Sequence, residues 1–184
     1  IPNMTVLSPK HKWELADMLR FALDHDGPVA VRYPRGSAFD EYQKCREPVR
    51  FGKSESIFEE RDIALFSVGH MFEVALKVRE RLKAEGFGCS LVNARFIKPL
   101  DEECIRGLSK NHRLIAVIEE NVASGACSQR VQECVSSWNL PVKVLSCALP
   151  DQYVEHGSVD VLRKETGIDE ESLTYRIIET YGEL

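Results

Sequence analysis

Short apolar runs alternate along the chain with longer segments in which apolar residues recur every three or four positions. The apolar runs predict strands at 4–7, 29–31, 63–68, 89–92, 114–118 and 142–145. The segments with helical spacing predict helices at 9–25, 71–85, 101–110, 124–138, 158–165 and 169–181. Strands that alternate with helices in this way predict a three-layer α/β fold, with a mostly parallel sheet covered by helices on both faces.

One predicted strand differs from the others. Residues 53–58 alternate weakly between polar and apolar, and only four residues, 59–62, separate them from the apolar run 63–68. This spacing predicts a hairpin in which 53–58 is an antiparallel edge strand. The run 63–68 is apolar at almost every position, which is typical of a central strand with both faces covered.

The first 36 residues form a separate strand–helix–strand unit that is too small for a core of its own. We expect Ser8 to cap its helix with Pro9 at the first position. One helix face carries Trp13, Ala16, Leu19 and Leu23. Residues 37–51 are polar, contain Pro48 and predict a linker, so the division is 1–36, 37–51 and 52–184. A chain that opens on Ile1 and enters a strand at once suggests a fragment or a processed product.

Composition removes several classes of function. The net charge is −5 and no run of Lys and Arg occurs, which argues against a nucleic-acid partner and against a polybasic membrane patch. The longest apolar run, 63–66, is far too short to span a membrane. The six cysteines form no Cys-x-x-Cys pair and do not cluster with histidines, which favours a reduced, cytoplasmic protein without a bound metal.

The stretch Arg32-Tyr33-Pro34-Arg35-Gly36 is the strongest candidate site. It follows a predicted strand, where open α/β sheets bind ligands, and a guanidinium matches a phosphate or carboxylate group. The same stretch is also typical of a surface turn with solvated arginines.

Other strand ends carry polar residues for which we favour structural roles. Arg95 and Lys98 follow a predicted strand and could contact an anion. We expect instead that Arg95 pairs with an acidic residue at a subunit contact and that Asp101 caps a helix. Glu119 and Glu120 should face opposite ways on an extended chain and so not share one site. His70 and His156 are predicted on loops, but no Ser or Cys nucleophile motif accompanies them.

These stretches together resemble the C-terminal portion of the 1-deoxy-D-xylulose-5-phosphate synthase family, in the transketolase superfamily. The resemblance covers essentially the whole chain. The matching segments are Ile1-Pro2-Asn3-Met4, 27–36, 93–101, Glu119-Glu120-Asn121 and 149–158. It implies that 1–36 end the pyrimidine-binding middle domain and that 52–184 form a transketolase-type C-terminal domain. In the family, thiamine diphosphate and Mg²⁺ serve to condense pyruvate with D-glyceraldehyde 3-phosphate, yielding 1-deoxy-D-xylulose 5-phosphate, a precursor of isoprenoids, thiamine and pyridoxal, and CO₂.

The resemblance also implies a homodimer, and it assigns the phosphate of the aldehyde to Arg35, with Arg32 as a weaker candidate. The family's cofactor, metal and catalytic residues have no counterpart here, so we expect this chain alone to bind no cofactor and to be inactive. The turn Ser124-Gly125-Ala126 has less glycine than the family's. Alternatives are a transketolase, a 2-oxo acid dehydrogenase beta subunit, a non-catalytic dimerisation or binding module, and a flavodoxin-like ligand-binding protein.

Overall fold

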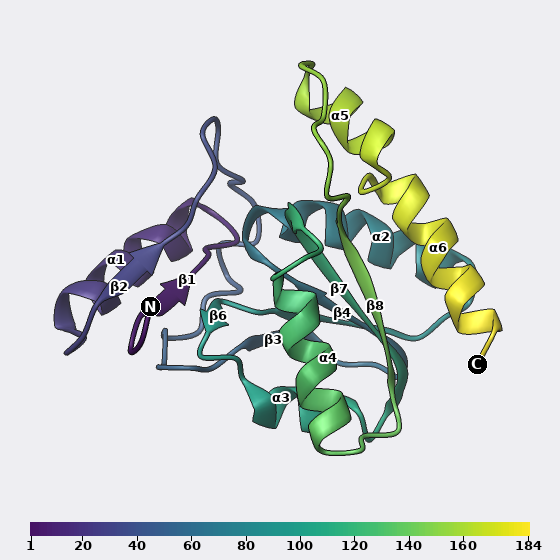
Figure 1. Ribbon diagram of the computed structural model, residues 1–184, viewed down its shortest axis with the longest axis horizontal. Helices are drawn as coiled ribbons and strands as arrows, with labels where there is room; N and C mark the ends of the chain where they lie inside the picture. The colour runs from purple at the N-terminus through teal and green to yellow at the C-terminus, as the bar shows by residue number, and fades with distance from the viewer.

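The computed structural model describes all 184 residues, and its centre is a five-stranded sheet in the order β3-β5-β4-β7-β8 (Figure 1). Four strands are parallel and the edge strand β3 is antiparallel, as predicted. The strands are β3 (Glu55–Phe58), β4 (Asp62–Ser67), β5 (Cys89–Asn93), β7 (His112–Val122) and β8 (Lys143–Leu149). The helices of this portion are η1 (Gly69–Met71), α2 (Phe72–Ala84), α3 (Glu102–Leu108), α4 (Cys127–Ser137), α5 (Val159–Thr166) and α6 (Glu170–Gly182).

Alternating side chains of the central strand β4 build two separate cores. Ile63 and Leu65 pack on one face with residues of α2 and α6. Ala64 and Phe66 pack on the other face with residues of α3 and α4. Because successive residues of a strand point to opposite faces, a strand that is apolar throughout needs helices on both sides. This arrangement confirms the predicted three-layer α/β architecture.

The first residues form a lobe beside this sheet, built from β1 (Thr5–Leu7), α1 (Lys12–Asp24) and β2 (Val29–Val31) (Figure 1). β1 and β2 are parallel, and β6 (Phe96–Lys98) completes the small sheet in the order β2-β1-β6. Leu7, Met18 and Phe96 form its buried core. The lobe therefore completes its core with a strand that belongs, in sequence, to the larger portion of the chain.

Two predictions about these elements are wrong, and one strand was missed. β3 does not form a hairpin with β4 but pairs with β5, because β5 and β7 occupy both edges of β4. The short strand β6 was not predicted. Ser8 does not cap α1, because its hydroxyl donates to the Arg32 carbonyl at 3.0 Å, and the helix starts three residues later than Pro9, with His11 as its N-cap.

The face of α1 that is buried does not carry the leucines of the apolar stripe. The buried residues of the helix are Glu14 and Met18. Leu19 and Leu23, by contrast, are 48% and 86% exposed. The two leucines of the apolar stripe are therefore exposed, whereas Trp13 and Ala16 are half-buried. Among all the helices, none is both long enough and apolar enough to cross a membrane.

Gly69, just after β4, lies in close contact with Ser8 of the lobe. Its φ is +58°, and a Cβ built there would lie 2.1 Å from the Ser8 hydroxyl. Gly86, at the end of α2, has a similar φ of +89° but open space around it. Both glycines therefore have a positive φ, but only Gly69 has a neighbouring side chain that an added Cβ would clash with.

We therefore expect Gly86→Ala to lower the free energy of unfolding by about 1–2 kcal/mol, the usual cost of a left-handed alanine. Gly69→Ala should cost clearly more, because the added methyl group also displaces Ser8. Denaturant unfolding of both variants measures the difference. In a Ser8→Ala background the penalty at position 69 should shrink; equal penalties at 69 and 86 would show that the close approach does not matter.

Candidate functional site

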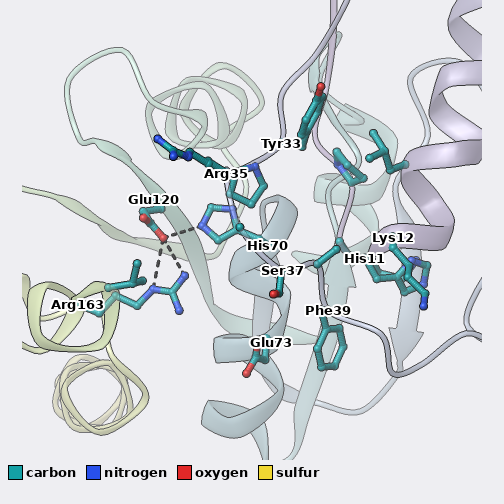
Figure 2. Close-up of a pocket in the computed structure, with 17 residues that line it drawn as sticks. His11, Lys12, Tyr33, Arg35, Ser37, Phe39, His70, Glu73, Glu120 and Arg163 are labelled. Atoms are coloured by element: carbon teal, nitrogen blue, oxygen red, sulfur yellow. Dashed lines mark hydrogen bonds and ion pairs between the residues drawn. The ribbon is translucent and has the colours of Figure 1, made fainter.

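A cavity of about 770 Å³ lies between the lobe and the carboxyl end of the large sheet (Figure 2). One wall comes from the start of α1 and the segment that follows β2. The opposite wall comes from η1, α2, the end of β7 and α5. The polar side chains in the lining are Lys10, His11, Lys12, Tyr33, Arg35, Ser37, His70, Glu73, Glu120 and Arg163.

Arg35 is the cation of this cavity without a partner. It follows β2 in an exposed segment, and no hydrogen bond or ion pair connects it to the other lining residues in Figure 2. Lys12 instead pairs with Asp40, and Arg163 pairs with Glu120. A free guanidinium at the rim of a cavity is suited to bind an anionic group of a ligand.

Arg32, the second arginine predicted for this site, does not line the cavity. Its backbone belongs to the lobe, where its amide donates to the Leu7 carbonyl at 2.8 Å. The structure therefore separates the two arginines and brings only Arg35 into the cavity.

Glu120 connects three distant segments on the far wall of the cavity. Its Oε2 accepts from His70 Nε2 at 2.6 Å and from Arg163 Nη2 at 2.9 Å. These residues come from β7, η1 and α5, and Figure 2 shows them together beside Arg35. The hydrogen bond from His70, reinforced by Arg163, lowers the pKa of Glu120 to about 2 although partial burial opposes the change. The carboxylate is thus ionised throughout the neutral range.

Glu119 points to the opposite side, as predicted for adjacent residues of a strand. It is buried, and it accepts from the backbone amides of Cys127 at 3.0 Å and Ser128 at 2.8 Å. These amides lie in the first turn of α4, where an anion would otherwise bind. The internal carboxylate already occupies them, so the turn around Gly125 does not serve as a phosphate site.

The remaining candidates have structural positions. The prediction that Arg95 pairs at a subunit contact is wrong, because Arg95 is buried within this chain and its acidic partners are Glu14 and Glu55. The Asp101 side chain caps α3, as predicted, by accepting from the Cys104 amide. Lys98 donates to the Ile1 carbonyl at the surface. His156 lies in an exposed loop and does not line the cavity.

The chain offers neither a reactive thiolate nor a ligand set for a metal. All six cysteines are free, and burial raises the pKa of the Cys89, Cys104, Cys127 and Cys147 thiols to about 12. Such thiols stay protonated at neutral pH and are poor nucleophiles. No three His, Cys, Asp or Glu side chains in the chain are grouped so that they could hold a metal ion.

Sequence reasoning missed Arg163 and the cluster around Glu120. Arg163 lies on a polar helix without a motif, 43 residues from Glu120, so nothing in the sequence indicates that the two meet. His70 was weighed as a lone loop histidine, and only the fold provides its carboxylate partner.

The comparisons with known proteins agree with this architecture. Residues 52–173 match the model of the transketolase C-terminal domain, and the chain belongs to this domain family. A solved structure described as a split-gene transketolase, an inactive beta4 tetramer, covers 99% of this chain and 58% of its own, with a TM-score of 0.90 at 21% identity. At that identity the likeness shows the shared fold.

Within this class, the chain is similar over its whole length to 1-deoxy-D-xylulose-5-phosphate synthases, as the sequence motifs predicted. It is 39% identical to the enzyme of Lachnoclostridium phytofermentans over 183 residues, which are 99% of this chain and 29% of the relative. It is 38% identical to that of Caldanaerobacter subterraneus, covering 100% of this chain and 30% of the relative. The chain thus spans less than a third of the length of these relatives.

The cluster at Glu120 makes a prediction about acid stability. A carboxyl whose folded-state pKa is lowered contributes stability above its unfolded-state pKa, and this contribution is lost as the pH falls toward the folded-state value. The free energy of unfolding should therefore fall between pH 4.5 and about 2 more steeply in the wild type than in Glu120→Gln. Urea unfolding at a series of pH values measures both slopes, and identical slopes would contradict the assignment.

Proposed function

We propose that this chain is the C-terminal part of a thiamine-diphosphate-dependent synthase that condenses pyruvate with D-glyceraldehyde 3-phosphate to 1-deoxy-D-xylulose 5-phosphate and CO₂. The observation that carries the proposal is the similarity along the whole chain to enzymes of that name. The cavity adds support, because it presents an unpaired arginine to an anionic ligand. The product would serve as a precursor of isoprenoids, thiamine and pyridoxal.

In this proposal Arg35 binds the phosphate group of the aldehyde. The guanidinium carries a permanent charge and offers parallel N–H groups, which match two phosphate oxygens. Its position after a β-strand, at the mouth of a cavity, leaves these donors available to a ligand. Arg32 is not part of the proposed contact, because it lies outside the lining.

The residues of this chain do not fit the cofactor. Mg²⁺ needs several oxygen ligands around one point, and no such group of side chains exists here. The first turn of α4, which could take a diphosphate oxygen, is filled by Glu119. We therefore place the thiamine diphosphate and Mg²⁺ sites in the portion of the longer protein that precedes this chain, and we propose that the chain alone is inactive.

The proposed domain division is 1–36 for the end of the middle domain, 37–51 for a linker and 52–184 for the C-terminal domain. We also propose a cytoplasmic homodimer. Six free cysteines, most of them buried, support a reducing compartment. One solved structure with the same fold is described as an inactive beta4 tetramer, which supports self-association of proteins that contain this domain.

An assay of the complete protein separates the synthase from its relatives. We expect product from pyruvate and D-glyceraldehyde 3-phosphate, and none from the ketose phosphate donors used by a transketolase. Activity with the ketose donors alone would assign the chain to a transketolase instead.

We predict that Arg35→Ala in the complete protein raises the KM for D-glyceraldehyde 3-phosphate far more than the KM for pyruvate. Loss of a charge-assisted contact costs about 1.5–3 kcal/mol, or roughly 10- to 150-fold in affinity. Steady-state kinetics with each substrate varied in turn measure both constants. Arg35→Lys should recover part of the loss, because it keeps the charge without the planar fork.

The matched control is Arg130→Ala, which removes an exposed arginine of α4 outside the cavity. It should leave both constants close to the wild-type values. An equal rise of both constants in Arg35→Ala would refute phosphate binding by Arg35.

A further inference from the structure

Five polar side chains are buried together where the lobe meets the large sheet. They form what we call the junction cluster, and none of them is more than 2% exposed: Lys10, Glu14, Glu55, Asn93 and Arg95. Lys10 and Glu14 belong to the lobe, whereas the other three belong to the large sheet and the loop after β5. Charged groups are rarely buried so completely unless they are paired.

The cluster is electrically balanced and its groups contact one another directly. Arg95 donates to Glu14 at 2.7 Å and lies 3.1 Å from Glu55. Lys10 Nζ contacts the same two carboxylates at 3.0 and 2.5 Å. The Asn93 amide donates to Glu14 at 2.9 Å. Two cations therefore neutralise two carboxylates that come from different portions of the chain.

Arg95 also holds the segment that connects the two portions. Its guanidinium donates to the carbonyls of Glu47 at 2.8 Å and Pro48 at 3.3 Å, while the Glu47 amide donates to Glu55. One side chain thus contacts the lobe, the connecting segment and the large sheet. Burial alone would raise the pKa of Glu14, but the charges of Lys10 and Arg95 outweigh it and hold that pKa below its ordinary value.

Stability alone does not account for such an arrangement. Buried ion pairs contribute little net stability compared with well-packed apolar side chains of similar volume. Arg95 moreover has a φ of +56°, a backbone conformation that is unfavourable for any residue with a side chain. A strained, buried and multiply bonded arginine is better explained by the geometry that it fixes.

A short series of hydrogen bonds leads from Arg95 to the cavity. The Arg95 carbonyl accepts from the Ser8 amide at 2.8 Å, and the Ser8 hydroxyl donates to the Arg32 carbonyl at 3.0 Å. Arg35 follows three residues after Arg32. A second connection runs through Lys10, which belongs to the junction cluster. Lys10 itself lines the cavity, and the start of α1, which forms one cavity wall, follows it directly in the sequence.

We infer that Arg95 is a positioning residue, which together with the junction cluster fixes the segment that carries Arg35 against the large sheet. The role toward the substrate rests on the proposed function. The mechanical role, the locking of the lobe to the sheet, does not depend on it. The two can therefore be tested separately.

Hydrogen exchange on this chain tests the mechanical role. Arg95→Lys keeps the positive charge but loses the planar guanidinium and its several N–H donors. The backbone amides of Ser8 and Arg32 should then exchange at least about tenfold faster, while the amides of β7 stay protected. The matched control is Arg79→Lys. Arg79 is also buried and ion-paired, but with Glu60 at the start of β5, whereas Arg95 follows the end of that strand. Arg79→Lys should accelerate exchange near α2 and leave the lobe unchanged.

Unchanged exchange of Ser8 and Arg32 in Arg95→Lys, or an equal effect of Arg79→Lys on the lobe, would overturn the inference. If Arg95→Lys does not fold, the isosteric Glu14→Gln replaces it, with the same expected acceleration of exchange at the Ser8 and Arg32 amides.

Kinetics of the complete protein test the consequence for the substrate. Arg95→Lys should raise the KM for the phosphorylated aldehyde more than the KM for pyruvate, although Arg95 does not line the cavity. Unchanged KM values in an active enzyme would overturn the role of Arg95 toward the substrate, whatever the exchange experiment shows for the mechanical role. Wild-type protein without this activity would instead refute the proposed function and leave the exchange experiment to decide the positioning role.

Discussion

The pairing of Arg95 with Glu14 and Glu55 sets how the two portions of the chain are placed relative to each other. The lobe has a core of only three fully buried apolar residues, one of which, Phe96, comes from β6. Its strands are three residues long, too short to be stable as an isolated sheet. The lobe therefore depends on the large sheet, and the buried charges define one relative orientation because any shift would leave an ion without its partner.

The cavity is a consequence of that orientation. Open α/β sheets bind ligands beyond the carboxyl ends of their strands. Arg35 follows the carboxyl end of β2, His70 that of β4, and Glu120 lies near that of β7. The strands of both sheets thus end at the cavity. The small sheet is followed by the unpaired Arg35, whereas the charged residues that follow the large sheet are already paired with each other. A ligand anion would find one unpaired cation there, Arg35.

The alternation of apolar and polar residues was sufficient to predict the α/β layers, the parallel sheet and the antiparallel edge strand. Periodicity reports which faces of an element are apolar, and it does not report what lies against them. Contacts between residues far apart in sequence determine that β3 pairs with β5 and that β6 joins the small sheet. They also determine which face of α1 is buried. Arg35 could be proposed because strand ends bind ligands, whereas Arg163 and the junction cluster required the fold, since Glu14 and Arg95 are 81 residues apart.

The outer side of the lobe has a further consequence. β2 is the last strand of its sheet, so one row of its backbone groups has no neighbouring strand, and Leu19 and Leu23 of α1 are exposed nearby in the same lobe. Unpaired strand edges beside apolar side chains are sites where a further strand adds readily. Produced by itself, the chain would present this three-residue edge and the two leucines to solvent, where a strand of a second copy can add. Covering or charging that edge would be the first step in making a well-behaved sample.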